Sequence, residues 1–426
     1  MWKSLQSVAS LMLSFGLLLM ANAMFGTLLG LRSKLEGFST ETVGFIMAGY
    51  FVGMLLGAVY AVRAVGAVGH IRAFAAFASI MSVAVLSHLL RVDPVSWFFL
   101  RLIAGFCMAG MVMVVESWLN ERATKTTRGQ IFSLYMMVNY MGSAIGQFAL
   151  TFGDPAEFEL FVIASIIFSI ALVPVLMTRS SAPKPAVPER MKFRALFAIS
   201  PLGVVATVCS GLANSSMNSL GPVFARDSGL SIAEISAFMA SVLLGGMVLQ
   251  YPVGRLSDRL DRRSILLITT LAASLACLGI VMATSMPVYW LFIAGGVYGS
   301  FCYTIYPLAA AQVNDLADQD RLVQVSAGIL IAYGLGAIMG PVIAGQLMGT
   351  WGPNALFLMT ASITAGLALF TAWRMFRRMR SSKRKTTYLP LGSWGLSSKQ
   401  FYASTLGHVL KNRQHESDAP GSEKHI

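Results

Sequence analysis

The stretch Gly254-Arg-Leu-Ser-Asp-Arg-Leu-Asp-Arg-Arg263 separates two long apolar segments of this chain. Charge at this density requires water, whereas each flanking segment is long and apolar enough to span a bilayer core about 30 Å thick. The stretch is too short to hold a domain, so we predict a tight hairpin between two transmembrane helices. Short loops rich in Lys and Arg stay in the cytoplasm, so this hairpin is expected on the inner side of the membrane.

The composition of the whole chain also indicates a membrane protein. Of the 426 residues, 56% are hydrophobic and 12% are charged, which is half the charged fraction of about 25% in soluble domains. Basic cytoplasmic loops explain the net charge of +13 better than a nucleic-acid partner does. The four cysteines lie far apart in apolar segments, a spacing that indicates neither a metal site nor a disulfide framework.

Twelve apolar segments of about 20 residues are predicted to be transmembrane helices. They form two sets of six, separated by a polar, proline-rich stretch. The fold class predicted is therefore an all-α polytopic membrane protein made of two six-helix pseudo-repeats. The first set is expected near residues 8–30, 41–62, 73–91, 95–118, 130–152 and 159–178, and the second near 196–220, 233–253, 264–284, 288–312, 323–349 and 353–373.

These segments divide the chain into four parts. We predict an N-terminal bundle over residues 1–178, a cytoplasmic linker over 179–195 and a C-terminal bundle over 196–373. A basic tail over 374–426 is expected to be cytoplasmic and disordered. Its basic cluster from Arg374 to Lys385 is typical of a stop-transfer flank, which anionic lipid headgroups attract.

The distribution of basic residues predicts the orientation. With the N-terminus in the cytoplasm, the predicted outer loops hold only four of the 32 Lys and Arg residues: Arg32, Lys34, Arg91 and Arg226. Both termini are therefore expected on the cytoplasmic side of the inner (plasma) membrane. Lys3 and Ala21-Asn-Ala23 imitate a signal peptide, but the apolar run continues to about Leu31, which favours a retained first helix.

The two sets of helices also share short motifs. Gly142-Ser-Ala-Ile-Gly146 in the fifth predicted helix matches Gly336-Ala-Ile-Met-Gly340 in the eleventh, and Gly53-Met54 in the second matches Gly246-Met247 in the eighth. Both matches have an offset of about 193 residues, as expected for a duplicated six-helix unit.

The charged hairpin resembles the signature loop Gly-x-Leu-x-Asp-Arg-x-Gly-Arg-Arg of the major facilitator superfamily, with Asp261 in place of the second glycine. The resemblance covers about residues 5–375. Within it, four short stretches look like the YcaD-type bacterial branch: Glu116-Ser, Arg128-Gly-Gln, Tyr135-Met-Met-Val-Asn-Tyr and Tyr306-Pro-Leu. The resemblance implies a monomeric secondary active transporter with the major facilitator fold, moving a small organic solute by alternating access.

The same resemblance implies a cytoplasmic gate at the hairpin. Its residues would be Gly254, Asp258, Arg259, Arg262 and Arg263, with Asp258 and the arginines locking the outward-open state. The corresponding first-half loop, between residues 57 and 72, has no acidic residue. We therefore expect an asymmetric gate, anchored mainly in the C-terminal half.

Two charged residues lie at membrane depth. Arg101 is expected about 10 Å below the outer surface, and Arg101-Leu-Ile-Ala-Gly105 resembles the Arg-x-x-x-Gly pattern that the family links to proton coupling. Snorkelling to the interface or a structural pair with a neighbouring helix are the alternatives for Arg101. Glu116 is a candidate proton site or the acidic half of an inner-gate ion pair. It lies about 22 Å from Arg101 along the helix, too far for direct pairing.

Neutral polar residues complete the candidate pathway. Facilitator cavities are lined mainly by helices 1, 4, 7 and 10, so the resemblance adds residues of these helices to Arg101 and Glu116. Hydrogen bonds between helices are the alternative explanation for each of them. The added residues are Asn22, Asn214, Asn218, Tyr303 and Tyr306.

Several function classes are disfavoured. The sequence contains no Gly-x4-Gly-Lys-Ser/Thr phosphate loop, so an ion or proton gradient is the expected energy source. We predict no enzyme activity, cofactor, metal site or nucleic-acid partner. The expected partners are a small-molecule substrate, protons and the lipid bilayer. A sensor or receptor on a transporter fold, without net transport, is the alternative.

Overall fold

The computed structural model describes residues 2–122, 128–177, 193–318 and 321–377, and every regular element in these ranges is helical. The first half contains α1 (Trp2–Leu35), α2 (Thr40–Val68), α3 (His70–Leu90), α4 (Pro94–Arg122), α5 (Arg128–Phe148), the 3-10 turn η1 (Ala149–Phe152), α6 (Glu159–Ile170) and α7 (Leu172–Leu176). The second half contains α8 (Phe193–Ile199), α9 (Pro201–Asp227), α10 (Ile232–Arg259), α11 (Arg262–Ala283), α12 (Val288–Asn314), α13 (Leu322–Trp351) and α14 (Ala355–Arg377).

Ten helical segments of the described chain are long and apolar enough to cross a membrane, with α6 and α7 together forming one of them. The two remaining predicted spans are also helices, α5 and α9, but their composition is more polar. In α9, almost every residue from Leu202 to Ala225 is buried by neighbouring helices. A helix enclosed by protein does not need an apolar face toward lipid, which explains why α9 tolerates its Asn and Ser residues.

Two predicted boundaries require correction. The span expected over residues 196–220 is interrupted at Ser200, because Pro201 starts a new helix and the Ser200 hydroxyl accepts a hydrogen bond from the Gly203 amide (3.2 Å). At the other end of the second half, α14 continues past residue 373 to Arg377. Most of the predicted linker (179–192) and of the predicted tail (378–426) lies outside the described residues.

The charged hairpin is also shorter than predicted. Helix α10 continues to Arg259 and α11 begins at Arg262, so only Leu260 and Asp261 separate them. Asp261 caps α11 by accepting a hydrogen bond from the Arg263 amide (3.0 Å). The charges of this stretch therefore lie on helix ends, where their positions are fixed.

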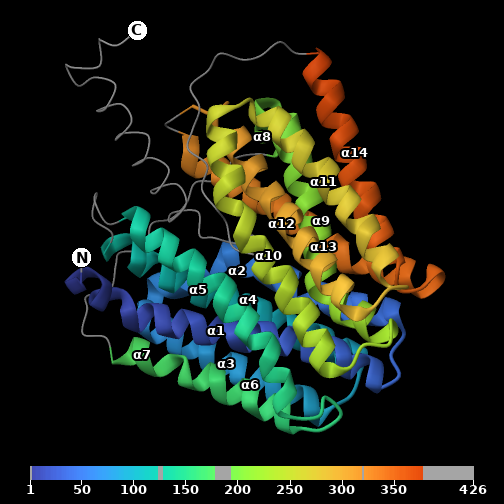
Figure 1. Cartoon of the computed structure of the whole chain (residues 1–426). Coiled ribbons are helices and arrows are strands. Elements are labelled where there is room, and N and C mark those ends of the chain that lie inside the picture. Colours follow the sequence, from blue (N-terminus) through green and yellow to red (C-terminus); the bar gives the residue numbers. More distant parts are fainter. Residues whose placement is uncertain (1, 123–127, 178–192, 319–320, 378–426) are drawn as a thin grey trace.

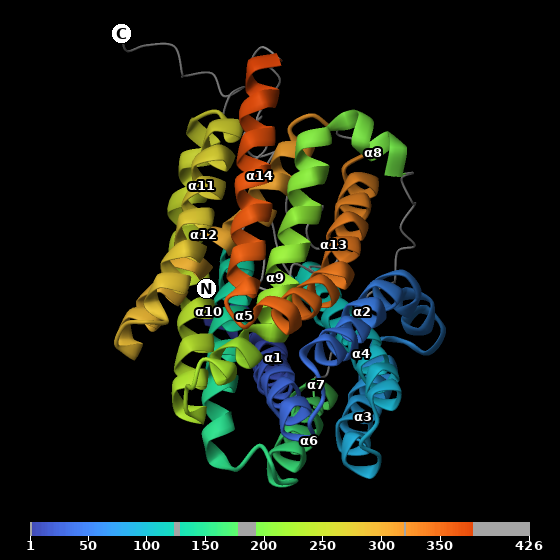
Figure 2. The same cartoon turned by 90° about the vertical axis from the view of Figure 1, so that its right-hand side faces the viewer.

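The helices form two groups that converge at one side of the molecule and spread apart toward the other (Figures 1 and 2). In the first group α2 packs on α4, and α1 on α5; in the second α10 packs on α12, and α9 on α13. Between the groups, α2 contacts α13, α5 contacts α10, and α1 contacts α9. The two halves thus enclose a region bordered by α1, α2, α5, α9, α10 and α13.

Where the groups converge, the ends of α1 and α9 are joined; we call this side the Lys34 end. The Lys34 ammonium lies 3.7 Å from the Asp227 carboxylate, and Arg226 donates to the Leu31 carbonyl (2.9 Å). Gly44 of α2 approaches the Pro341 backbone of α13 so closely that a Cβ atom would collide with it. The opposite side carries the α10–α11 hairpin, and we call it the Arg262 end.

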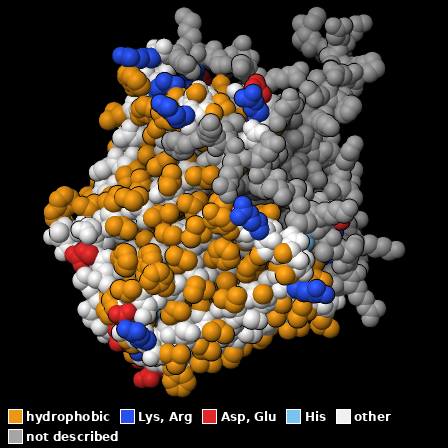
Figure 3. All heavy atoms as spheres, turned by 180° about the vertical axis from the view of Figure 1, so that it is seen from behind, with side chains coloured by type: hydrophobic (Ala, Val, Ile, Leu, Met, Phe, Trp, Pro, Cys, Tyr) orange, Lys and Arg blue, Asp and Glu red, His pale blue; other side chains and the backbone are white. Residues whose placement is uncertain are grey.

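The outer surface fits a lipid environment. Figure 3 shows one face of the molecule on which apolar side chains form a broad continuous area, with charged side chains around its margins. Large apolar side chains such as Val83, Ile268, Leu275 and Leu369 are exposed. In water such a surface would aggregate, whereas in a bilayer it is the expected exterior.

Candidate functional site

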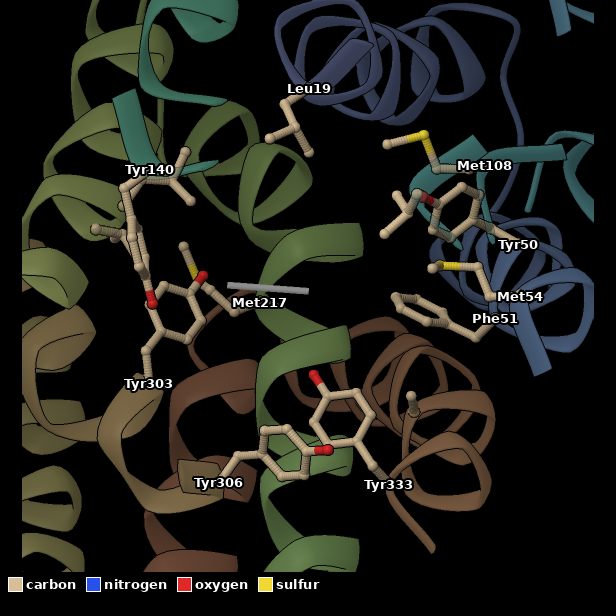
Figure 4. Packing of buried hydrophobic residues seen from close by; sticks show 14 of the residues in the cluster. Leu19, Tyr50, Phe51, Met54, Met108, Tyr140, Met217, Tyr303, Tyr306 and Tyr333 are labelled. Atoms are coloured by element: carbon tan, nitrogen blue, oxygen red, sulfur yellow. The ribbon is translucent and has the colours of Figure 1, made fainter. Parts of the chain in front are cut away.

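Side chains from both halves converge on one central region between the two groups of helices (Figure 4). The hydrophobic side chains labelled there are mostly aromatic or thioether groups, which suit a pocket that accepts an organic molecule. All of the labelled side chains are buried. They are Leu19 of α1, Tyr50, Phe51 and Met54 of α2, Met108 of α4, Tyr140 of α5, Met217 of α9, Tyr303 and Tyr306 of α12, and Tyr333 of α13.

Arg101 is the charged residue at one side of this region. It lies two helical turns before Met108, on the same face of α4. Its guanidinium carbon is 4.4 Å from the ring centre of Tyr50 and 5.6 Å from that of Phe25. The side chain is 3% exposed, so it does not snorkel to the surface of the protein, and that alternative is excluded.

The guanidinium of Arg101 is incompletely satisfied. Its Nε and Nη1 atoms have no hydrogen-bond partner among the described residues, and none of the described ion pairs includes it. Cation–π contacts contribute about 0.5–2 kcal/mol each, whereas a buried arginine costs about 2.5–3.5 kcal/mol on insertion scales, and more in other treatments. The two aromatic contacts together contribute about 1–4 kcal/mol, which is similar to the insertion-scale cost. They leave the N–H donors of Nε and Nη1 without an acceptor among the described residues, so an anionic partner would stabilise the site further.

Asn22 lies close to the same group. Its side chain is beside the Tyr50 hydroxyl, and Phe25 follows one turn later on the same face of α1. Within the described part of the chain, neither amide atom of Asn22 has a hydrogen-bond partner. An amide that can both donate and accept therefore lies beside the tyrosine that contacts Arg101.

The opposite wall is formed by α9 and α12. The Tyr303 hydroxyl donates to the Asn218 side chain (3.0 Å), and the Asn214 amide donates to Ser210 (3.3 Å). Asn218 Nδ2 and Asn214 Oδ1 have no partner among the described residues. The Tyr306 ring packs on that of Tyr333, with centres 4.7 Å apart. The predicted residues of α9 and α12 are thus brought together on one wall.

Glu116 lies apart from this region. It is fully buried, and Tyr135 of α5 donates a hydrogen bond to its carboxylate. The Tyr135 ring in turn stacks on Phe15 of α1, with centres 4.5 Å apart. The structure therefore separates Glu116 from Arg101, as the helix spacing predicts, and ties it to α1 and α5 near the Arg262 end.

The predicted gate residues form a network centred on Arg262. Its guanidinium lies 3.2 Å from Asp258, 2.7 Å from Asp315, which directly follows α12, and 3.1 Å from the Ser257 hydroxyl. Arg262 is 2% exposed. These contacts join α10, α11 and α12, so they stabilise the C-terminal half at its Arg262 end.

The other predicted gate residues have smaller roles in this network. Arg263 pairs with Asp261 (3.0 Å), Gly254 is buried within α10, and Arg259 is exposed at the end of that helix. Exposed charges of this kind contribute little to stability. In the contacts described, Arg262 is thus the predicted gate residue that pairs with two carboxylates.

The sequence model of the Major Facilitator Superfamily matches this chain twice, over residues 11–227 and 203–413. Together the two matches cover most of the sequence. The chain belongs to the Major Facilitator Superfamily. It is accordingly a multi-pass membrane protein of a transporter family and not an enzyme, as the sequence predicts.

Similar members of this superfamily occur in bacteria. The chain is 30% identical over 362 residues to an uncharacterized MFS-type transporter of Yersinia pestis, covering 83% of this chain and 92% of that one. It is 28% identical over 355 residues to the uncharacterized MFS-type transporter YcaD of Escherichia fergusonii, covering 82% and 90%. The resemblance to the YcaD branch is thereby confirmed.

Solved structures of the superfamily share the fold. The nucleoside transporter NupG superposes with a TM-score of 0.72 at 14% identity, covering 87% of this chain and 99% of that one. A D-xylose-proton symporter superposes with a TM-score of 0.65 at 13% identity, covering 92% and 99%. At these identities the likeness concerns the architecture alone.

Several residues that contact the predicted site residues were not predicted from the sequence. Tyr50 contacts Arg101 but carries no polar signal within its apolar helix. Asp315 completes the Arg262 network. Its position shortly after the predicted span 288–312 places a carboxylate at a helix end, from which such a contact could have been predicted. His88 donates to the Ala84 carbonyl (2.7 Å) and lies edge-on to Phe25, with centres 5.2 Å apart. Its Nε2 atom has no partner in the described part of the chain.

Proposed function

We propose that this chain is a secondary active transporter that moves a small organic solute across the bacterial inner membrane by alternating access, coupled to protons. Both termini would be cytoplasmic and the protein would act as a monomer. The observation that carries the proposal is the position of Arg101. A buried, incompletely paired charge lies beside a central region to which both halves contribute, which is where a facilitator binds its substrate.

We further propose twelve membrane spans arranged as a duplicated six-helix unit. Glycine contacts support the duplication. A Cβ on Gly53 of α2 would collide with the Leu102 carbonyl of α4, and one on Gly245 of α10 would collide with the Gly296 carbonyl of α12. The two contacts are equivalent and about 193 residues apart, as a parallel repeat requires. In the proposed repeat, Gly245 and not Gly246 would be the counterpart of Gly53.

The conformation described here is proposed to be inward-facing. The contacts Lys34–Asp227 and Arg226–Leu31 join the halves at the Lys34 end, which the distribution of basic residues assigns to the outside. The helices spread apart toward the Arg262 end (Figure 1). During the transport cycle the Lys34 end would open while the Arg262 end closes, and Asp258 with its arginines would then contact the N-terminal half.

Glu116 is the candidate proton site, since it is a carboxyl group fully buried between helices and bonded to Tyr135. Arg101 would bind the solute in the same pathway. Asn22, Asn214, Asn218, Tyr303 and Tyr306 would contact the solute. In this arrangement proton binding and solute binding occur at separate places on α4, so helix movement would couple them.

The proposal is tested by transport currents in proteoliposomes of the full chain, recorded on a solid-supported membrane with a panel of organic solutes. At least one solute should produce a current that an imposed pH gradient enhances. Binding of a solute without any flux would instead favour a sensor on a transporter fold and would contradict the proposal.

A matched pair of variants tests the proton site. Glu116→Gln should abolish flux driven by the pH gradient while leaving solute exchange at equal pH intact. Glu121→Gln, on the same helix but exposed, should behave as the unmodified protein. Equal gradient-driven flux in both variants would remove Glu116 from the pathway.

A further inference from the structure

The surroundings of Arg101 point to the chemical class of the solute. Outside their terminal turns, the helices that line the central region contain no Asp or Glu except for Glu116 of α4, and Glu121 lies in the last turn of that helix. The other lining helices are α1, α2, α5, α9, α12 and α13. Glu116 of α4 is about 22 Å away along the helix and is bonded to Tyr135. In the described chain, the local charge near Arg101 is therefore positive and uncompensated.

Donors for an anion are already in place. Arg101 presents two nitrogen atoms with no partner in the described chain. It lies over the ring of Tyr50, and the amide of Asn22 lies beside the hydroxyl of the same tyrosine. Carboxylate and sulfonate groups match a guanidinium, because two oxygen atoms can accept from its fork of N–H donors. A cation would be repelled, and a neutral sugar would leave the charge uncompensated.

Beyond this anion position the region is apolar. Met108 lies two turns along α4 from Arg101, about 10 Å, and Met54, Phe51 and Met217 face the same centre (Figure 4). These side chains accept hydrocarbon or an aromatic ring, and flexible methionines adapt to its shape. A small inorganic anion would leave this surface without a partner.

We propose that the central region binds an amphipathic organic monoanion, with its carboxylate or sulfonate on Arg101 and Asn22 and its apolar body between the methionine and tyrosine side chains. The inference rests on the proposed function, since it names the substrate class of the same site. The hydroxyl of Tyr303 and the amide of Asn218 would contact the far end of the solute, where they favour a single polar substituent.

The test uses three probes with the same body: 3-phenylpropionate, 3-phenylpropan-1-ol and 3-phenylpropylamine. Binding to the full chain in lipid nanodiscs is measured by isothermal titration calorimetry. The anion should bind at least about tenfold more tightly than either of the other two, a difference typical of a charge-assisted contact. Equal affinities, or preference for the alcohol or the amine, would overturn the proposal.

Variants of single residues test whether Arg101 produces the preference for the anion. Arg101→Gln should reduce the affinity for 3-phenylpropionate at least about tenfold, leaving that for the alcohol unchanged, and Arg101→Lys should keep part of the preference for the anion. Arg91→Gln removes an exposed charge near the same end of the molecule and is the control. An anion preference that survives Arg101→Gln would contradict the assignment.

A second variant covers the case in which Arg101→Gln fails to fold. Asn22→Asp supplies a carboxylate within the protein, so it should raise the melting temperature and weaken 3-phenylpropionate binding. Unchanged binding in this variant would count against the site. Inorganic chloride and nitrate are tested alongside, and equal affinity for them would contradict an amphipathic solute.

Failure of this inference can be distinguished from failure of the proposed function. Transport currents with a neutral or cationic solute, unaffected by Arg101→Gln, would overturn the anion class and leave the transporter intact. Binding of 3-phenylpropionate through Arg101, with no current for any solute, would keep the site and overturn transport.

Discussion

Arg101 on α4 and Arg262 at the start of α11 are buried to nearly the same extent, 3% and 2% exposed, yet their surroundings differ. Arg262 contacts two carboxylates and a hydroxyl, all within 3.2 Å. Arg101 lies against two aromatic rings, and two of its nitrogen atoms have no partner among the described residues. The protein thus neutralises one buried charge with its own residues and not the other.

This difference distinguishes a charge that holds helices together from a charge that is available to a ligand. A buried charge whose partners are fixed holds helices together, and its removal leaves those partners unpaired. A buried charge without a fixed partner costs stability in the empty protein and can be retained because a ligand compensates it. On this basis we infer that Arg262 stabilises the C-terminal half, and we propose that Arg101 contacts the solute.

The largest effect is expected at the paired arginine. Arg262→Gln should lower the free energy of unfolding by about 1.5–3 kcal/mol, because it leaves the partly exposed carboxylates of Asp258 and Asp315 without their cation. Denaturation of the purified protein in detergent measures this loss. Arg259→Gln, an exposed charge three residues earlier, is the matched control and should change stability by less than about 0.5 kcal/mol. Equal stability of the two variants would show that the Arg262 pairs contribute nothing.

The gate role of the same network predicts a functional effect. Asp258→Asn should leave expression intact, since Asp315 still pairs with Arg262, but should lower the transport rate several-fold by weakening closure of the Arg262 end. Initial rates in proteoliposomes measure this change. A rate equal to that of the unmodified protein would restrict Asp258 to a structural role.

A substitution on the opposite wall of the central region should reduce solute affinity by a smaller factor. Tyr303→Phe removes the hydrogen bond to Asn218 (3.0 Å), so solute affinity should fall by about 1 kcal/mol, roughly fivefold. Calorimetry with 3-phenylpropionate checks this value. A loss as large as that of Arg101→Gln would mean that the charge does not dominate binding.

The smallest effect is expected at the Lys34 end. The ion pair between Lys34 and Asp227 is partly exposed, and such pairs contribute about 0–1 kcal/mol. Lys34→Gln should therefore shift the balance slightly toward outward-facing protein without changing global stability. Spin labels on α1 and α9 at this end, read by double electron–electron resonance, should report a larger population of long distances. An unchanged distribution would assign no gating role to the pair.

The sequence predicted much of the architecture because membrane spans are long, apolar and separated by charge. The motif from Gly254 to Arg263 identified the superfamily, and the spacing of Arg101 and Glu116 on one helix predicted their separation correctly. Boundaries were less accurate. The break at Ser200–Pro201 and the continuation of α10 to Arg259 depend on local capping, which hydropathy does not record.

The partners of these charges could not be predicted in the same way. Arg262 meets Asp315 across 53 positions, and Arg101 meets Tyr50 on another helix. Both contacts depend on how helices are placed against one another. Hydropathy also cannot indicate at which end the two halves are joined. The contrast between a paired and an unpaired arginine therefore emerges only from the fold.

Melting temperatures of Arg101→Gln and Arg262→Gln, each measured with and without 3-phenylpropionate, test this contrast most directly. Arg101→Gln should melt at or above the temperature of the unmodified protein and should lose the stabilisation by the anion. Arg262→Gln should melt at a lower temperature and keep that stabilisation. If Arg101→Gln instead melts as low as Arg262→Gln and still responds to the anion, Arg101 is a structural residue and the account is contradicted.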